Sequence, residues 1–214
     1  KGGFENRPKM SLIRLKLSLI RALRNQKTTY SLYMLEGEVK IIKQAKSGDQ
    51  ASFGALYDHY ITPIYRFVMV KTNHKPDAED LTHEVFLSAW QNLKKYKFQG
   101  FPFSSWLYQI ARNKVIDYYR TKKMHYSIDD VDENLFEIVG TLERGLDRSI
   151  ALESVKTALS ELSPDQQDVI VMKFIEDLSN EEISKVMGKS DGAIRLLQHR
   201  AVNNLKAKLW KTNS

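Results

Sequence analysis

The sequence predicts an all-α protein of two small helical domains joined by a flexible acidic linker, with a helix-turn-helix as the second domain. The 214 residues are enough to bury two small hydrophobic cores. Apolar residues recur at helical spacing before and after residues 121–146, which show no sustained period. Two sets of helix-capping residues follow that stretch, and both are typical of short, sharply bounded helices.

The chain is expected to open with a basic extension, residues 1–35, that is poorly ordered. An alternative is a basic amphipathic helix lying on an anionic membrane surface. The residues that would form its apolar side are Leu12, Ile13, Leu17, Ile20 and Leu23. No apolar run is long enough to cross a bilayer, so we expect no stable membrane insertion and a cytoplasmic protein.

The first folded domain is predicted over residues 36–123. Apolar residues at helical spacing from 53 to 68 indicate a helix that Pro63 should kink or restart near Thr62. Asp77 is predicted to cap the next helix because it directly precedes a helical apolar stripe. After a basic aromatic loop, Ser104 or Ser105 is predicted to cap a helix that runs to about residue 120.

The second folded domain is predicted over residues 147–214, after an acidic linker at 124–146. Ser163 and Ser179 each begin a capping-box sequence, and Gly188 stands where a left-handed C-terminal cap is expected. A longer helix should start after Ser190. A short capped helix, a turn and a basic helix predict a helix-turn-helix over residues 162–209, whose second helix enters the DNA major groove.

Charge is segregated along the chain. Residues 94–123 carry 8 basic and 1 acidic side chains, residues 124–184 carry 4 and 15, and residues 185–214 carry 7 and 1. Two basic segments flanking an acidic one predict two separate nucleic-acid-binding surfaces. The chain has no cysteine and no histidine spacing typical of a metal site, so we expect no cofactor and no metal.

The predicted recognition helix has two distinct faces. At 100° per residue, one stripe of the helix, which faces away from the basic side chains, is made of Ile194, Leu197, Ala201 and Leu205. Arg195 and Arg200 on the other side are the strongest candidates for contacts to bases or phosphates. The candidate duplex-binding residues are Lys189, Ser190, Arg195, Leu196, His199 and Arg200. Leu196 would contact a thymine methyl or a protein, or is simply an exposed leucine.

The loop at residues 94–103 interleaves cations with aromatic residues, a combination that stacks bases of single-stranded nucleic acid. An alternative is that Tyr96, Phe98 and Phe103 fill the core of the domain. In the helix that follows, Asn113 is the best candidate to read a base edge. The candidate single-strand-binding residues are Lys97, Phe98, Arg112, Asn113, Asp117 and Arg120.

Residues 77–86 (DAEDLTHEVF) and 106–113 (WLYQIARN), followed by Asp117, resemble domain two of extracytoplasmic-function (ECF) sigma factors of bacteria. The C-terminal unit resembles their domain four. The resemblance covers about residues 36–209. It departs from the family pattern at His83, where glutamine is frequent, and at Leu196, where a polar residue is frequent.

The resemblance implies binding to core RNA polymerase, on its flap and on the clamp helices of its largest subunit. It also implies that domain two captures the melted minus-ten strand, that domain four reads the minus-thirty-five duplex, and that an anti-sigma factor is a possible partner. The residues implied at the clamp helices are Asp80, His83, Glu84, Phe86 and Leu87.

Two alternatives remain open from the residues alone. A stand-alone dimeric helix-turn-helix regulator would place two recognition helices one turn apart on a palindrome. A recombinase would need Tyr118 or Tyr119 as nucleophile, and the sequence places no set of arginines and histidines around them and contains no Gly-rich phosphate loop. The sequence therefore favours a non-enzymatic transcription initiation factor.

Overall fold

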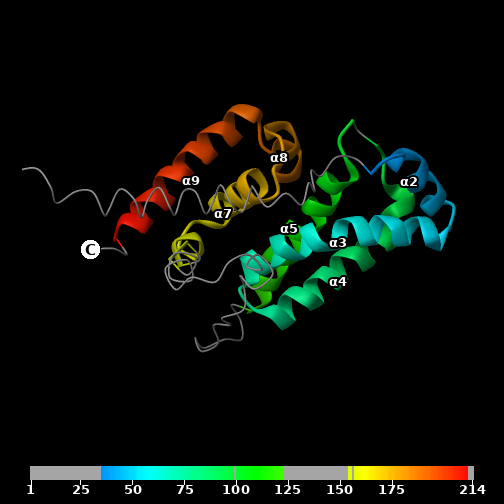
Figure 1. The fold of residues 1–214 in the computed structure, drawn as a ribbon, viewed down its shortest axis with the longest axis horizontal. Helices are drawn as coiled ribbons and strands as arrows, with labels where there is room; N and C mark the ends of the chain where they lie inside the picture. The colour runs from blue at the N-terminus through cyan, green and yellow to red at the C-terminus, as the bar shows by residue number, and fades with distance from the viewer. Residues whose placement is uncertain (1–34, 99, 123–153, 156, 212–214) are drawn as a thin grey trace, which may run out of the picture.

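The computed structural model describes residues 35–98, 100–122, 154–155 and 157–211, and these residues form helices without a β-strand among them (Figure 1). The predicted extension and the predicted acidic linker lie outside the described residues. The helices are α2 (Glu38–Lys46), α3 (Gln50–Thr72), α4 (Lys75–Asn92), the 3₁₀ turn η1 (Leu93–Lys95), α5 (Phe103–Lys122), α7 (Pro164–Ile170), the π-helical turn η3 (Val171–Ile175), α8 (Asn180–Met187) and α9 (Asp191–Lys211).

The first domain is a helical bundle in which α3 packs against α2, α4 and α5. Its core is rich in aromatic residues, and Tyr60, Phe67, Phe103 and Tyr108 are all fully buried. Phe67 and Tyr108 meet edge to face with ring centroids 5.5 Å apart, a geometry that aromatic rings prefer. This core holds α4 and α5 side by side, so that the loop between them and the outer faces of both helices point to the surface.

The start of α5 differs from the prediction that Ser104 or Ser105 caps it. The helix begins at Phe103, and both serines are buried within its first turn. Glu38 supplies the cap from α2, because its Oε2 accepts a hydrogen bond from the backbone N–H of Phe103 at 3.1 Å. A carboxylate at a helix N-terminus satisfies a free N–H and is favoured by the helix dipole. The cap is therefore a tertiary contact, which local sequence does not reveal.

Two further boundaries in the first domain correct the predictions. α3 runs as one helix of 23 residues with Pro63 inside it, so of the two predicted alternatives, a kink or a restart near Thr62, the restart does not occur. α4 starts at Lys75, and its N-cap is His74, whose Nδ1 accepts from the N–H of Asp77 at 3.4 Å. Asp77 therefore lies in the first turn rather than at the cap.

The second domain confirms the predicted helix-turn-helix boundaries. Ser179 and Glu182 form the predicted capping box at α8, with hydrogen bonds of 3.2 and 2.7 Å between each backbone N–H and the other side chain. Gly188 ends α8 in the left-handed conformation with φ of 62°, which suits glycine because it has no Cβ. α9 then starts at Asp191, directly after Ser190.

The two domains are in contact. α8 of the second domain packs against α5 of the first, and η3 lies against α3 (Figure 1). A buried apolar cluster runs through both domains. The surfaces that the sequence assigns to nucleic acid are therefore placed relative to one another by this contact.

Candidate nucleic-acid interface

The outer face of α9 carries the predicted duplex-binding side chains. Arg195, Leu196, His199 and Arg200 are all exposed, while Ile194 on the opposite side is fully buried. Arg195 forms an ion pair with Asp191 at 2.8 Å, one turn earlier in the helix. Such an exposed pair is weak and is readily exchanged for a nucleic-acid contact. The amphipathic pattern predicted for this helix is therefore confirmed.

The turn before α9 has its own internal bonds. Ser190 caps the helix, since its Oγ accepts a hydrogen bond from the N–H of Ala193 at 3.3 Å. Lys189 lies 3.2 Å from a carboxylate oxygen of Asp165 in α7. Both residues were predicted to contact duplex DNA, and the structure gives each of them a local partner as well.

The basic aromatic loop divides between core and surface. Tyr96 and Phe103 are buried and their rings contact each other edge to face at 5.3 Å, as expected for core residues. Burial, followed by the charge of Glu38, raises the pKa of Tyr96 to about 12. Phe98 is 50% exposed and Lys97 is exposed. Among the described aromatic residues of the loop, Phe98 is therefore the one that is most available to stack on a base, and Phe101 is partly exposed.

The predicted single-strand-binding residues of α5 do not share one environment. Asn113, Asp117 and Arg120 are exposed, and Asp117 pairs with Arg120 at 3.1 Å. Arg112 instead points to the second domain, where its Nε lies 2.8 Å from Asp168 and a terminal nitrogen lies 2.7 Å from Asp165. Three of the four side chains are accessible, and the fourth is held by carboxylates.

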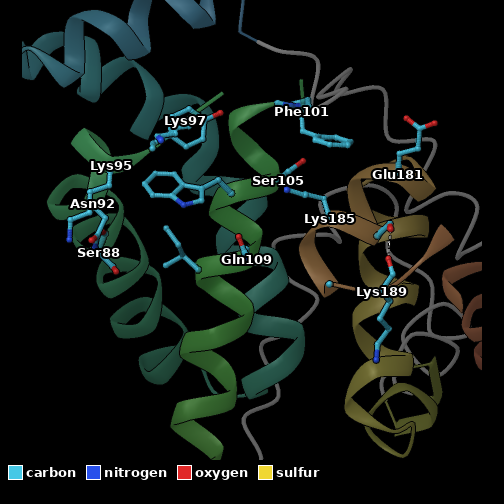
Figure 2. Close-up of a pocket in the computed structure, with 16 residues that line it drawn as sticks. Ser88, Asn92, Lys95, Lys97, Phe101, Ser105, Gln109, Glu181, Lys185 and Lys189 are labelled. Atoms are coloured by element: carbon cyan, nitrogen blue, oxygen red, sulfur yellow. Dashed lines mark hydrogen bonds between the residues drawn. The ribbon is translucent and has the colours of Figure 1, made fainter. Parts of the chain in front are cut away.

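A cleft of about 890 Å³ is lined by the aromatic loop and α5 on one side and by α8 on the other (Figure 2). Lys95 and Lys97 line it from the first domain, and Lys185 and Lys189 line it from the second. Phe101, Trp106 and Glu181 also line it, together with several serine and amide side chains. The two basic surfaces that the sequence predicts as separate therefore border the same cleft in this structure.

The exposed face of α4 forms a third surface. Asp80, His83 and Glu84 are exposed, and Glu84 pairs with Lys114 of α5 at 2.9 Å. Leu87 is 57% exposed. Phe86, which the resemblance implied at this surface, is only 3% exposed and packs edge to face on Tyr57 at 4.8 Å. The ring of Phe86 therefore belongs to the core rather than to the exposed face of α4, and its implied role in docking stays a prediction.

The sequence matches two known family models in the order expected for this fold. Sigma-70 region 2 matches residues 56–124, and the region 4 model of sigma-70 factors matches residues 152–205. The ECF RNA polymerase sigma factor SigW of Bacillus subtilis (strain 168) is 31% identical over 187 residues, which cover 79% of this chain and 95% of SigW.

The chain belongs to the ECF sigma factors. It is an RNA polymerase sigma factor, a DNA-binding protein that directs transcription initiation.

The chain is also similar to the ECF sigma factor BldN of Streptomyces coelicolor, with 34% identity over 170 residues. The match covers 78% of this chain and 64% of BldN, so the chain spans less than two thirds of that relative. Among solved structures, CnrH in complex with the cytosolic domain of CnrY matches with a TM-score of 0.62 and 26% identity, covering 81% of this chain and 97% of CnrH.

Several residues of this sigma factor that matter to the interface were not predicted. Ion pairs between domain two and domain four involve Arg66, Lys71, Asp168 and Glu176. No local sequence motif marks these residues. Trp90 extends the exposed apolar surface of α4 at 36% exposure and contacts Phe53 with ring centroids 4.7 Å apart. The acidic character of residues 124–184 was a signal for Asp168 and Glu176, but no such signal marked Arg66 and Lys71.

The electrostatics favour the charged forms of the interdomain groups around Arg112. Burial tends to raise the pKa of Asp165, but hydrogen bonds from Lys189 and Arg112 outweigh burial and place that pKa below its usual value. Burial opposes the charge of Arg112, and Asp168 and Asp165 together more than offset it, so the pKa of Arg112 is raised.

In the described part of this sigma factor, no cluster of three or more potential metal ligands is found. None of the described helices has both the length and the hydropathy required to cross a bilayer.

Proposed function

We propose that this sigma factor contacts its promoter through two surfaces, the outer face of α9 for the minus-thirty-five duplex and the surface around α5 for the melted minus-ten strand. The observation that carries the proposal is the exposed basic face of α9, which follows a capped α8 and a left-handed Gly188. This is the geometry in which a recognition helix lies in the major groove with its N-terminal residues on base edges.

For the minus-thirty-five duplex, Arg195 and Arg200 supply the base or backbone contacts. Both are exposed in the first half of α9. Lys189, Ser190, Leu196 and His199 surround them. An arginine that pairs bidentately with guanine discriminates by roughly 1–3 kcal/mol, whereas a phosphate contact only positions the helix.

For the minus-ten strand, Lys97 and Phe98 at the loop tip provide a cation and a stacking surface. Asn113, Asp117 and Arg120 supply polar groups on the exposed side of α5, and Arg112 joins them once it is released from domain four. A single-stranded base stacked on an aromatic ring contributes roughly 1–3 kcal/mol. The cations along the loop and α5 follow the phosphates of the same strand.

For core polymerase, the exposed face of α4 provides the docking surface. It combines the acidic Asp80 and Glu84 and His83 with an apolar patch of Leu87 and Trp90. Hydrophobic residues surrounded by charges are typical of protein interfaces. The clamp helices of the largest subunit are the proposed partner of this face, and the flap is the proposed partner of domain four.

Promoter melting requires the polymerase. Separating about ten base pairs at about 1.4 kcal/mol of stacking per step costs on the order of 14 kcal/mol. Capturing two bases by stacking returns at most about 6 kcal/mol. The sigma factor alone cannot offset the difference, so we propose that strands separate only in the holoenzyme and that the chain performs no covalent chemistry itself.

We also propose that this sigma factor acts in the cytoplasm with the polymerase and has a regulatory protein partner of the anti-sigma class. CnrH, which is similar in fold and sequence, was solved in complex with the cytosolic domain of CnrY. Co-purification of a tagged chain from cells, followed by identification of bound proteins, tests for such a partner beside the polymerase subunits.

The test of the proposed function is run-off transcription from a promoter library with purified core polymerase. The chain is expected to direct a defined set of start sites. The variant Asp80→Lys/Glu84→Lys is expected to lose core binding and all start sites, whereas Lys206→Ala at the distal part of α9 is expected to retain them. Absence of any chain-dependent start site would rule the proposal out.

A further inference from the structure

Leu196 lies at the centre of the outward face of α9. At about 100° per residue it is turned about 200° from Ile194, which is fully buried. The buried side of α9 packs against α7 and α8, so Leu196 faces away from the rest of domain four, and it is 50% exposed. In a helix-turn-helix, the outward side of the second helix is the side that faces the bases.

Leu196 is an isolated apolar side chain. In the part of domain four that the structure describes, it is the one large hydrophobic residue that is exposed. Sites for protein partners are typically contiguous apolar patches rather than single side chains. Arg195, His199 and Arg200 surround Leu196 and are exposed as well. The partner of this face must therefore accept several cations together with one small apolar contact, and duplex DNA has both properties.

The start of α9 carries little side chain. Gly192 and Ala193 are exposed and precede Leu196 by about one turn on the same face. A Cβ added at Gly192 would meet no atom within 4 Å, so the helix is open at this point. The backbone at this end of α9 is therefore free to approach a groove closely, which brings a side chain as short as leucine within reach of the bases.

The nearest amide side chain on α9 is committed to the domain itself. Nε2 of Gln198 donates to Oδ1 of Asn180 in α8 at 2.8 Å, and both residues are partly buried. A glutamine reads adenine through a free amide group, whereas this amide links the two helices. Gln198 therefore does not compete with Leu196 for the base.

Thymine is the base whose edge suits an aliphatic side chain. Its 5-methyl group lies in the major groove, where the other bases are distinguished by hydrogen-bond donors and acceptors. A leucine placed over an amino or keto group removes the hydration of that group and replaces no hydrogen bond, which is unfavourable. Contact with a methyl group buries apolar surface on both sides. An aliphatic side chain at this position therefore favours thymine over the other three bases.

We propose that Leu196 is a specificity-determining residue of this sigma factor, and that its side chain contacts the 5-methyl group of one thymine in the minus-thirty-five element. Arg195 and Arg200 hold the helix in the groove on either side of this contact. The inference rests on the proposed function of α9 and adds the base that one position of the element must carry.

The first experiment removes the methyl group and nothing else. Promoters are selected from a library with the holoenzyme, and each thymine of the selected minus-thirty-five element, on either strand, is replaced in turn by deoxyuridine. Deoxyuridine keeps the hydrogen-bonding edge of thymine and lacks the 5-methyl group. At one of these thymines, we expect the affinity of the holoenzyme for a labelled promoter duplex to fall about fourfold, the effect of exposing one buried methyl-sized group.

The second experiment repeats the measurement with variants of α9. Leu196→Ala should bind the unsubstituted promoter about fourfold more weakly and should not respond to that deoxyuridine, because the methyl group has lost its apolar partner. Leu196→Met keeps an aliphatic side chain and should retain most of the response. Arg200→Ala is the matched control, because it weakens binding through a separate contact and should keep the full fourfold response to deoxyuridine.

Two controls identify other roles of this side chain. Leu196→Ala should keep the thermal stability of the unchanged chain and its affinity for core polymerase without DNA, since the residue is exposed. A loss of core binding would show that Leu196 contacts a protein, and it would overturn the proposal. An equal deoxyuridine response in Leu196→Ala and the unchanged chain, or no response at any thymine, would also overturn it. A holoenzyme that initiates nowhere in the library would instead reject the proposed function as a whole.

Discussion

Arg112 of α5 donates from Nε to Oδ2 of Asp168 at 2.8 Å, across the boundary between domain two and domain four. The two residues lie 56 positions apart. The arginine side chain is 19% exposed and the aspartate side chain 3%. This pair is therefore less exposed to solvent than the surface ion pairs of the same chain. The effect of that burial on its interaction free energy can be measured.

A double-mutant cycle of Arg112→Ala and Asp168→Ala should give a coupling free energy of about 1–3 kcal/mol, because the groups share one hydrogen-bonded, buried network. The reference pair is Arg120 and Asp117, which is largely exposed and should couple by no more than about 0.5 kcal/mol. Urea denaturation of the four chains in each cycle provides the values. Equal coupling in both cycles would contradict the buried role of Arg112.

Glu176 provides a pH-dependent test. Burial raises its pKa, although hydrogen bonding and charge from Arg66, with a smaller effect of Tyr108, act in the opposite direction. Because the folded chain holds this proton more tightly than the unfolded chain, the stability that this group contributes falls as pH rises from its usual pKa through the raised one.

Arg66→Met removes the main cation facing Glu176 and leaves a buried carboxylate unpaired. We expect a loss of about 3 kcal/mol in the free energy of unfolding at neutral pH. The loss should shrink between neutral pH and a mildly acidic pH, because protonation of Glu176 removes the unpaired charge. Glu176→Gln should cost less than Arg66→Met at neutral pH. Urea denaturation at the two pH values checks this, and a loss that does not depend on pH would refute it.

The turn of the helix-turn-helix is tested by the same substitution at two glycines. Gly188→Ala should destabilise domain four by about 1 kcal/mol, because a Cβ strains the left-handed conformation. Gly192→Ala should stabilise it by up to about 1 kcal/mol, because Gly192 lies inside α9. Neither added Cβ would meet an atom within 4 Å, so sterics do not distinguish the two sites. Thermal denaturation giving the same sign for both would be inconsistent with the φ of 62° at Gly188.

Base recognition is tested on α9. Arg200→Ala should lower initiation from a selected promoter by about tenfold, within the roughly 1–3 kcal/mol range of a specific arginine contact. Lys206→Ala, further along the helix and also exposed, should change it less than about threefold, since N-terminal residues of a recognition helix contact the bases. Run-off transcript yield is the measurement. Equal losses would place the DNA contact elsewhere on the helix.

Local signals predicted the helix-turn-helix well. The capping box that begins at Ser179 and the left-handed Gly188 are local signals, because each involves residues only a few positions apart. The sequence alone therefore predicts both ends of α8 and the start of α9. Cap prediction was wrong where the cap is tertiary, as at α5, whose first N–H is bonded to Glu38 from 65 positions away. It was also wrong at α4, where His74 rather than Asp77 is the cap.

The surfaces were harder to predict than the helices. Phe86 was placed on the docking surface by resemblance, but the buried face of α4 is broad enough to include it beside Val85. The pairing of Arg112 with Asp165 and Asp168 has no periodic signature. The segregation of charge was visible, and it was assigned to two nucleic-acid surfaces rather than to attraction between domains. Only the fold shows that the carboxylates of α7 reach α5.

The most direct test of the account is permanganate footprinting of a selected promoter with the sigma factor alone, core polymerase alone, and both together. We predict reactive thymines around the minus-ten element only when both are present, because the sigma factor lacks the binding free energy to separate the strands. Reactive thymines with the sigma factor alone, or none with the two combined, would contradict the account.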